Sequence, residues 1–192
     1  MTQGTVTTAA SETGLMLTLL NTRFGQRERR HDDWPDRAAM EDWLRERNLI
    51  TAEDLVTEGD FRRAVAMREA LRQLLRRPTQ DDAVHDAQAT LRGLASHLLL
   101  KVDVVSASVS RLSPESTGVD GFLAQVLAEM YTAMATGSWQ RLKVCHNIAC
   151  SRAFYDGSRN RSGLWCSAKA CGNRMHAQTY RQRRPARYIG ST

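Results

Sequence analysis

The sequence lacks any long apolar run. Its early apolar stretch, LMLTLL at residues 15–20, is too short for a secretory signal, and no basic segment precedes it. Nowhere does the chain approach the roughly 18 consecutive apolar residues that a membrane span requires. These absences predict a soluble, cytoplasmic protein with no membrane partner.

Cysteine is absent from most of the chain, because all four cysteines lie between positions 145 and 171. In a reducing compartment, clustered cysteines indicate metal ligands before they indicate disulfides. A chain of 192 residues buries roughly two-thirds of its unfolded surface, so it does not depend on disulfides to fold.

Catalytic patterns are also absent. The five histidines are scattered, and no nucleophile–base pair, phosphate-binding loop or paired-carboxylate pattern accompanies them. We therefore predict that the protein is not an enzyme.

Acidic residues are nearly missing from the C-terminal quarter. Residues 1–140 carry 16 basic and 20 acidic side chains, a net charge of −4, whereas residues 141–192 carry 11 basic side chains and one acid, Asp156, a net charge of +10. Such asymmetry favours an acidic body joined to a basic module that binds an anion, most plausibly nucleic acid. The alternative is a basic tail that solubilises the protein or docks on its own body.

Helical periodicity dominates the first 137 residues. It predicts helices from about Pro35 to Asn48, from an N-cap at Thr51 to Pro78, from 81 to 97 and from 122 to 135. The capping pair of the second helix is Thr51 and Asp54. In the last helix we expect five core positions: Phe122, Val126, Leu127, Met130 and Met134.

Two segments of the same region break this pattern. RERRHDDW, at residues 27–34, is predicted to be a charged loop. LLLKVDVVSASVSRLS, at residues 98–113, is rich in β-branched residues and predicts a small β-hairpin with its turn at 106–108. The expected fold class is therefore mainly α (α+β), with residues 1–14 disordered, a helical domain at 15–137 and a second module at 138–192.

The cysteines form two close pairs, Cys145-x4-Cys150 and Cys166-x4-Cys171, separated by fifteen residues. Two such pairs suit tetrahedral zinc, and four sulfur ligands leave no open position for water. We predict one structural Zn²⁺ per chain. Disulfides, an iron–sulfur cluster and free thiols are the less favoured alternatives.

The residues around the cysteines predict a treble-clef-like finger. RAFYD and LWC are expected to pair as a hairpin, and Ser167 to cap a helix from about Ala168 to Arg184. Phe154 and Trp165 would form the small core. Because apolar residues are few, metal binding must supply most of this module's folding free energy.

The stretch from Cys145 to Arg174, with YRQRR following, resembles the CGNR zinc-finger proteins of bacteria. The name-giving motif stands here as Cys171-Gly172-Asn173-Arg174. Upstream, LLNTR (19–23) and AMREALRQLL (66–75) resemble the helical N-terminal ABATE domain of the same family. The resemblance implies a transcription regulator whose finger binds nucleic acid.

The last helix offers a polar stripe for that role, since Arg174, Gln178 and Arg181 recur at i, i+4 and i+7. Arginine and glutamine read base edges or hold phosphates, so we predict duplex DNA as the partner. RNA is the runner-up target. Four further residues complete the predicted surface: Lys169, Arg159, Arg161 and Arg184.

Two sets of polar residues are assigned other roles. Asn160 and Asn173 are expected to hydrogen-bond sulfur or cap backbone, and Asp156 to pair with Arg159 or Arg174.

The role of the N-terminal domain stays open between two classes. One is a sensor that binds a small-molecule effector or partner, with Asn21, Arg68 and Arg72 as ligand-binding candidates because both arginines share a helix face. The alternative for the arginines is a surface ion-pair network. The other class is an interaction module that forms a homodimer.

Overall fold

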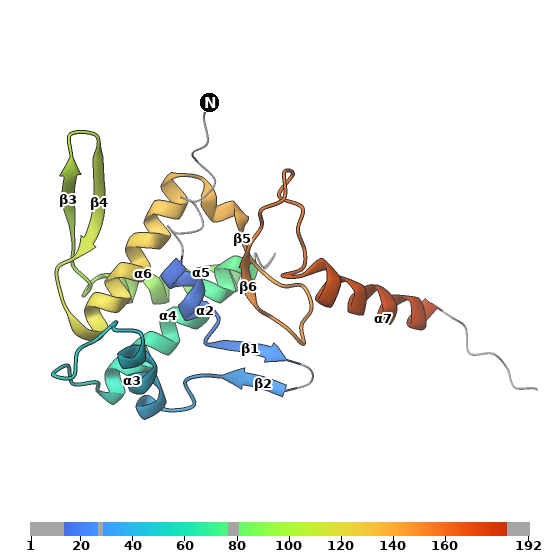
Figure 1. Cartoon of the computed structure of the whole chain (residues 1–192), viewed down its shortest axis with the longest axis horizontal. Coiled ribbons are helices and arrows are strands. Elements are labelled where there is room, and N and C mark those ends of the chain that lie inside the picture. The colour runs from blue at the N-terminus through green and yellow to red at the C-terminus, as the bar shows by residue number, and fades with distance from the viewer. Residues whose placement is uncertain (1–13, 27–28, 77–80, 184–192) are drawn as a thin grey trace, which may run out of the picture.

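The computed structural model describes residues 14–26, 29–76 and 81–183 (Figure 1). The disorder predicted for residues 1–14 and the position of Arg184 fall outside these ranges, apart from Gly14. No helix among the described residues is long and apolar enough to cross a membrane. The helices are α2 (Gly14–Leu20), α3 (Arg37–Glu46), α4 (Glu58–Arg76), α5 (Asp81–Ala95), α6 (Gly118–Ala135) and α7 (Asn173–Arg183).

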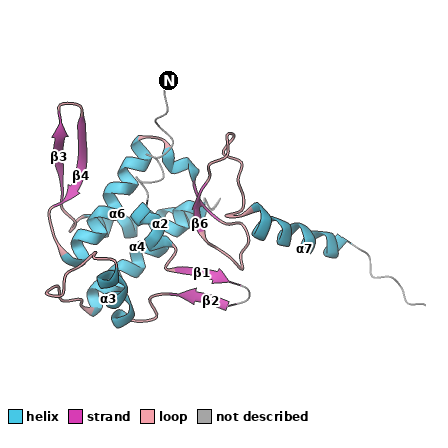
Figure 2. Ribbon diagram, in the orientation of Figure 1, coloured by secondary structure: helices cyan, strands magenta, loops and turns pink. Residues whose placement is uncertain are grey.

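The strands in the described part of the chain form three separate antiparallel hairpins (Figure 2). They pair as β1 (Arg23–Gln26) with β2 (Arg29–Asp32), β3 (Leu100–Ser106) with β4 (Val109–Pro114), and β5 (Leu142–Val144) with β6 (Ala153–Tyr155). The fold class is α+β, as predicted, and the predicted hairpin at 98–113 is confirmed. The charged-loop prediction for residues 27–34 was wrong for residues 29–32, which form β2 and pair residue for residue with β1.

The core of the body is built around α6, which contacts α2, α4 and β4. Phe122 of α6 packs against Trp34 and Trp43, and the two tryptophan rings meet edge to face with centroids 5.2 Å apart. Edge-to-face contacts add to the free energy that aromatic burial already supplies. Met134, predicted to be core, is 46% exposed at the C-terminal end of the helix.

The longest helix begins later than its sequence suggests. Thr51 does form the expected turn, since its backbone N–H donates to Asp54 Oδ2 at 2.7 Å, yet α4 begins only at Glu58. A second Thr-x-x-Asp pattern caps it, with Thr57 N–H donating to Asp60 Oδ2 at 2.8 Å. Between the two turns the chain is not helical, and Val56 is buried in the core there.

The two ends of the molecule are clearly separated in Figure 1. The β3–β4 hairpin stands on one side of the body, and the cysteine-containing loops and α7 lie on the other. Strands β5 and β6 join the two parts, because Leu142, Val144 and Ala153 belong to the main hydrophobic core. The domain boundary near Gly137 stays a prediction. Gly137 has a left-handed φ of 73° just after α6 ends.

Candidate metal centre and nucleic-acid surface

The first cysteine pair lies in a tight loop between β5 and β6. Cys145 N–H donates to the Arg152 carbonyl at 2.8 Å, and Cys150 N–H donates to the Asn147 carbonyl at 2.8 Å. Ser151 adopts a left-handed φ of 51°, which turns the chain back toward β6. The loop thereby brings the two sulfurs close together.

The second pair is positioned by a helix start. Ser167 caps the turn as predicted, since its hydroxyl accepts from Ala170 N–H at 3.1 Å. The turn at Ala168–Gly172 is a π-helix that continues into α7 at Asn173. Cys171 therefore sits in the turn that leads into the basic helix.

The four sulfurs gather around one point. All four Sγ atoms lie within 4.8 Å of one another, and none is in a disulfide. The distances from Cys166 Sγ are 3.6 Å to Cys150 Sγ and 3.8 Å to Cys171 Sγ. Sulfurs about 2.3 Å from a central zinc are about 3.8 Å apart, whereas a disulfide requires about 2.0 Å. Cys145, Cys150, Cys166 and Cys171 thus form a site for one zinc ion.

Asn147 supplies a further indication that a metal thiolate belongs here. This side chain is only 3% exposed, and its Oδ1 accepts from Ala149 N–H at 3.1 Å. Its buried Nδ2 has no hydrogen-bond partner among the described residues. The amide instead faces Cys171, whose thiol pKa is lowered because hydrogen bonds from the other thiols and Asn147 outweigh the effect of burial. A zinc-bound thiolate is the acceptor that such a buried donor requires.

Burial raises the pKa of the Cys150 and Cys166 thiols, since a thiolate is poorly solvated in this cluster. A bound Zn²⁺ compensates for that cost by neutralising the charge. When bound, the ion supplies a closed tetrahedral anchor and no reactive water.

The finger's hairpin differs from the predicted one. β6 pairs with β5, which precedes the first cysteine pair, whereas the LWC segment forms no strand. His146 N–H donates to the Leu164 carbonyl at 3.0 Å, and the His146 ring lies edge to face with the Trp165 ring, so loop and side-chain contacts hold this segment in place of strand pairing. Phe154 and Trp165 pack against the cysteine cluster as expected.

Asp156 organises the loop between the cysteine pairs. It pairs with Lys143 at 2.6 Å rather than with the predicted Arg159 or Arg174, and its Oδ2 also accepts from Gly163 N–H at 2.8 Å. The Lys143 ammonium also donates to the Gly163 carbonyl at 3.0 Å. These hydrogen bonds outweigh burial and hold the pKa of the Asp156 carboxyl well below its usual range. Lys143 is nearer because β5 and β6 are paired, which the sequence did not reveal.

The two asparagines expected beside sulfur, Asn160 and Asn173, are both exposed. The described contacts place neither against a cysteine. Asn147 is the asparagine that lies beside the cysteine cluster. Its position between Cys145 and Cys150 is the feature of the sequence that could have predicted this.

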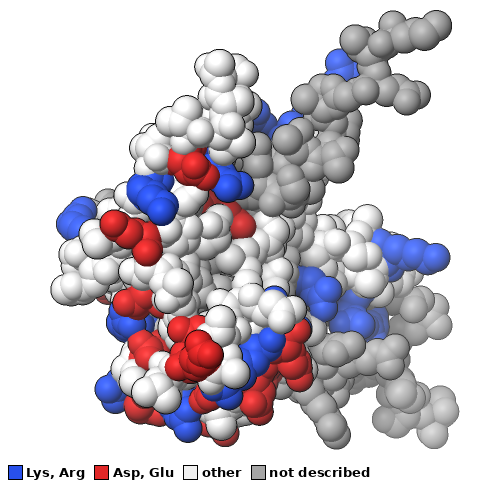
Figure 3. Space-filling view, turned by 60° about the vertical axis from the view of Figure 1, so that its left-hand side comes forward, with Lys and Arg blue, Asp and Glu red and all other residues white. Residues whose placement is uncertain are grey.

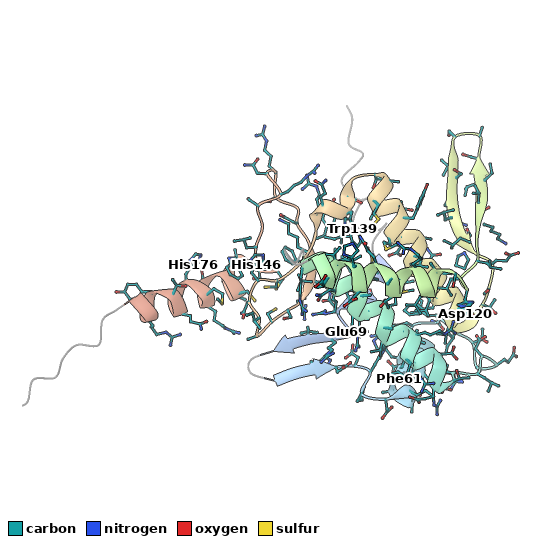
Figure 4. The ribbon with its side chains drawn as sticks, turned by 180° about the vertical axis from the view of Figure 1, so that it is seen from behind. Phe61, Glu69, Asp120, Trp139, His146 and His176 are labelled. Carbon is teal, nitrogen blue, oxygen red and sulfur yellow. The ribbon has the colours of Figure 1, made fainter. Side chains whose placement is uncertain are left out.

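The predicted nucleic-acid residues are exposed on the finger. Arg174, Gln178 and Arg181 lie along α7, which extends away from the body (Figure 4). Lys169 is exposed in the turn before α7, and Arg159 is exposed in the loop after β6.

Arg161, in the same loop, adopts a φ of 52° and donates to Gln140 Oε1 at 2.7 Å. Arg159 and Arg161 are therefore distant in sequence from the polar stripe on α7, but they are exposed on the same zinc finger.

The three candidate ligand-binding residues instead make contacts inside the protein. Asn21 bonds both backbone groups of Ala153, with its Nδ2 3.0 Å from the carbonyl oxygen and its Oδ1 2.9 Å from the nitrogen. Arg72 donates to the Leu20 carbonyl at 2.6 Å and to the Ser151 carbonyl at 2.5 Å. These contacts hold the cysteine loop against the body.

Arg68 is 1% exposed, yet it belongs to an ion-pair network, because Asp32 and Glu69, its partly exposed partners, both pair with Arg23 as well. It donates to Thr22 Oγ1 at 2.9 Å and to Asp32 at 3.0 Å, and its guanidinium lies over the Trp34 ring. Burial without a strong opposite charge lowers the pKa of the Arg72 guanidinium. Sequence spacing correctly put both arginines on one helix face, but that face is internal.

A groove of about 730 Å³ separates the body from the finger. Its walls come from β1, the end of α4, the first cysteine loop and the start of α7. Arg23, Arg76, Ile148, Met175 and Gln178 are among its lining residues.

The fold and the tetrathiolate site define a zinc-finger protein with a helical N-terminal domain. Comparison with known families identifies both parts. The CGNR zinc finger matches residues 141–184, and the ABATE family, described as "Putative stress-induced transcription regulator", matches residues 14–137. The chain belongs to the ABATE family and carries a CGNR zinc finger. A search of curated proteins found no match.

Proposed function

We propose that the protein is a transcription regulator that binds duplex DNA through its zinc finger, with α7 as the principal contact. The observation that carries the proposal is the charge of the finger's exposed surface. Arg174 and Arg181 lie on a helix that extends into solvent, and Lys169 precedes it. Asp156, the one acid after residue 140, is buried and paired. No acidic side chain therefore competes with phosphate on this surface.

The body carries the opposite character. In Figure 3 acidic side chains are spread over the body among basic ones, whereas the charged side chains on the opposite edge are basic. An anionic duplex is attracted to the finger and repelled by acidic parts of the body, which orients it toward α7.

Zinc supports this function without entering any chemistry. Cys171 lies in the π turn that runs directly into α7, so the metal fixes the start of the helix. The descriptions of the two families name a zinc finger and a transcription regulator, and neither names an enzymatic activity.

The test is a titration of zinc-loaded protein with duplex DNA fragments selected from genomic DNA, at several salt concentrations. Replacing Arg181 with Ala should weaken binding by about 1–3 kcal/mol if it reads a base, or lower the salt slope by about one unit if it holds a phosphate. Arg92→Ala, which removes an exposed arginine from α5 in the body, is the matched control and should leave affinity unchanged.

Arg174 requires a second measurement, because it lies three residues after Cys171. Its variant must retain one zinc per chain before a loss of affinity is assigned to a contact. Zinc-loaded protein with no salt-dependent affinity for DNA would defeat the proposal, and tighter binding to single-stranded RNA would favour the alternative target.

Ligand control is the second part of the proposal, and the groove between body and finger is its basis. The donors of Asn21, Arg68 and Arg72 are engaged with the protein itself. Arg72 nevertheless lines the groove, so we assign an effector to this space and not to the donors of these three residues. Arg76 is exposed there, and Gln178 from the stripe on α7 lines the same space. An anionic effector that changes DNA affinity in the wild type, but not in Arg76→Ala, would support this assignment. An effector that changes the DNA affinity of Arg76→Ala as much as that of the wild type would refute the assignment.

A further inference from the structure

The β3–β4 hairpin has an apolar face that the protein leaves open to water. Val102 and Val104 are 67% and 72% exposed. In most antiparallel sheets the apolar residues of an alternating strand pack on the core, so this exposure is unusual. The residues opposite them on β4 are Leu112 and Ser110. The other face carries the charged residues Lys101, Asp103 and Arg111 beside the exposed Val109, and Asp103 accepts from Arg111 Nε at 3.0 Å.

The hairpin also leaves a strand edge unpaired. Among the described strands β3 pairs only with β4. Two-stranded hairpins are marginally stable alone, and an exposed edge presents backbone donors and acceptors to any matching strand. Pro114 ends β4 and lacks an N–H, so β3 is the better edge for further pairing.

We propose that β3 pairs antiparallel with β3 of a second copy of this chain, about a twofold axis through Val102. The proposal goes beyond DNA binding and does not depend on it. In this register Val102 lies opposite Val102 of the second copy, and Leu100 lies opposite Val104 of the second copy. Both pairs fall on the apolar face, which becomes continuous across four strands.

The same register satisfies the charges of the polar face. Lys101 lies opposite Asp103 of the second copy, and the twofold axis repeats the pair in reverse. Each Asp103 is then flanked by its own Arg111 and by Lys101 of the second copy. Moving the axis by one residue to Asp103 would place two aspartates face to face, which is unfavourable. Charge complementarity therefore favours the register centred on Val102 over those centred on Lys101 or Asp103, and this register gives the closed twofold interface of a dimer.

The position of the hairpin is compatible with the finger's role. It stands on the opposite side of the body from α7 in both views of the ribbon (Figures 1 and 4). A dimer formed through β3 leaves both basic helices uncovered.

Sedimentation equilibrium of the zinc-loaded full chain tests the proposal. We expect a concentration-dependent shift from 21.6 kDa to twice that mass. Val102→Lys, which places two cations on the axis, should raise the dimer dissociation constant by at least about tenfold. Val109→Lys replaces another exposed valine of the hairpin, on the outer strand, and should leave the constant unchanged.

A mixing experiment separates this register from any other association. In the proposed dimer, residue 101 of one copy faces residue 103 of the other in two symmetry-related rows. Lys101→Glu alone places like charges opposite one another in both rows, and so does Asp103→Lys alone. A mixture of the two variants restores an opposite-charge pair in each row, so the mixture should dimerise although neither variant does. Circular dichroism and zinc content confirm that each variant is folded.

Three results would overturn the proposal. The first is a chain that stays at 21.6 kDa at every concentration. The second is a dimer that Val102→Lys leaves intact. The third is a mixture of the two charge variants that remains monomeric.

Discussion

Arg72 of α4 donates to the carbonyl oxygen of Ser151 at 2.5 Å, although 79 residues separate them in sequence. Two more hydrogen-bonded contacts join the same surfaces. Gly25 N–H donates to the Cys150 carbonyl at 2.6 Å, and Asn21 bonds the backbone of Ala153. We call these three contacts the seam. The cysteine loop is therefore held by the body as well as by the metal.

Arg72→Met should weaken the seam while keeping an apolar stem of similar length. The variant leaves the Leu20 and Ser151 carbonyls without their donor, which should lower the free energy of unfolding by about 1–3 kcal/mol. Thermal unfolding measures the loss, and amide hydrogen exchange should rise in the loop at 145–153. Arg62→Met, at an exposed position of the same helix, should change stability by less than about 0.5 kcal/mol. Equal effects of the two changes would show that the seam contributes nothing.

Gly25→Ala should separate β1 from the cysteine loop. A Cβ at this position would lie 1.8 Å from the Ala149 carbonyl oxygen, a backbone atom that no side-chain rotation relieves. We expect a lower melting temperature and faster reaction of the cysteines with a thiol reagent. Gly93→Ala on α5 is the matched change, because its Cβ would meet nothing within 4 Å and alanine favours a helix. A Gly25→Ala protein as stable as the wild type would contradict the close approach.

Asp156→Asn should destabilise the finger by about 3 kcal/mol at neutral pH, because it leaves the largely buried Lys143 ammonium without its counter-charge. The pKa of the Asp156 carboxyl is lowered from 3.8. The ion pair therefore stabilises the fold fully above pH 4, and its contribution is lost as pH falls toward the lowered value.

The stability difference between wild type and Asp156→Asn should accordingly shrink in acid, as measured by denaturant unfolding across pH. Glu46→Gln, in an exposed ion pair with Arg47, serves as the control and should show little difference at any pH. A difference for Asp156→Asn that does not depend on pH would assign its effect to lost hydrogen bonds instead of charge.

Removal of zinc should unfold the finger but leave most of the helical circular dichroism. Helices α2 to α6 form the main core, and no cysteine lies within them. The melting temperature of the body should nevertheless fall, since Leu142, Val144 and Ala153 are core residues adjacent to the cysteine loop. Chelation followed by thermal unfolding tests both statements. Loss of nearly all helical signal would show that the body depends on the metal for folding.

The sequence predicted the features that depend on local chemistry. Ser167 caps its turn, Asn48 ends α3 with a φ of 54°, and the four cysteines meet because their spacing alone demands it. Helical periodicity also located the apolar stripes of α4 and α6.

Features that depend on tertiary contact were missed. Two Thr-x-x-Asp patterns occur before α4, and the segment between them is held by tertiary contacts, among them the buried Val56 side chain and the hydrogen bond from Arg37 to its carbonyl. Arg68 and Arg72 have the sequence pattern of surface residues, yet both are buried because backbone carbonyls and Asp32 accept their donors. Asp156 pairs with Lys143 because the short strands β5 and β6 pair with each other. Strands of three residues carry almost no periodic pattern in the sequence, so this pairing was not predicted.

The seam also bears on how such fingers are inherited. A substitution at Gly25 or Arg72, far from any cysteine in sequence, would impair the finger. A genetic study would then wrongly attribute the defect to a function of the N-terminal domain. Compensating changes would arise across the contact, in the stretch from Ala149 to Ala153. A finger transplanted from a relative would work poorly unless β1 and the end of α4 travelled with it, so the unit that recombination can exchange is larger than the cysteine motif.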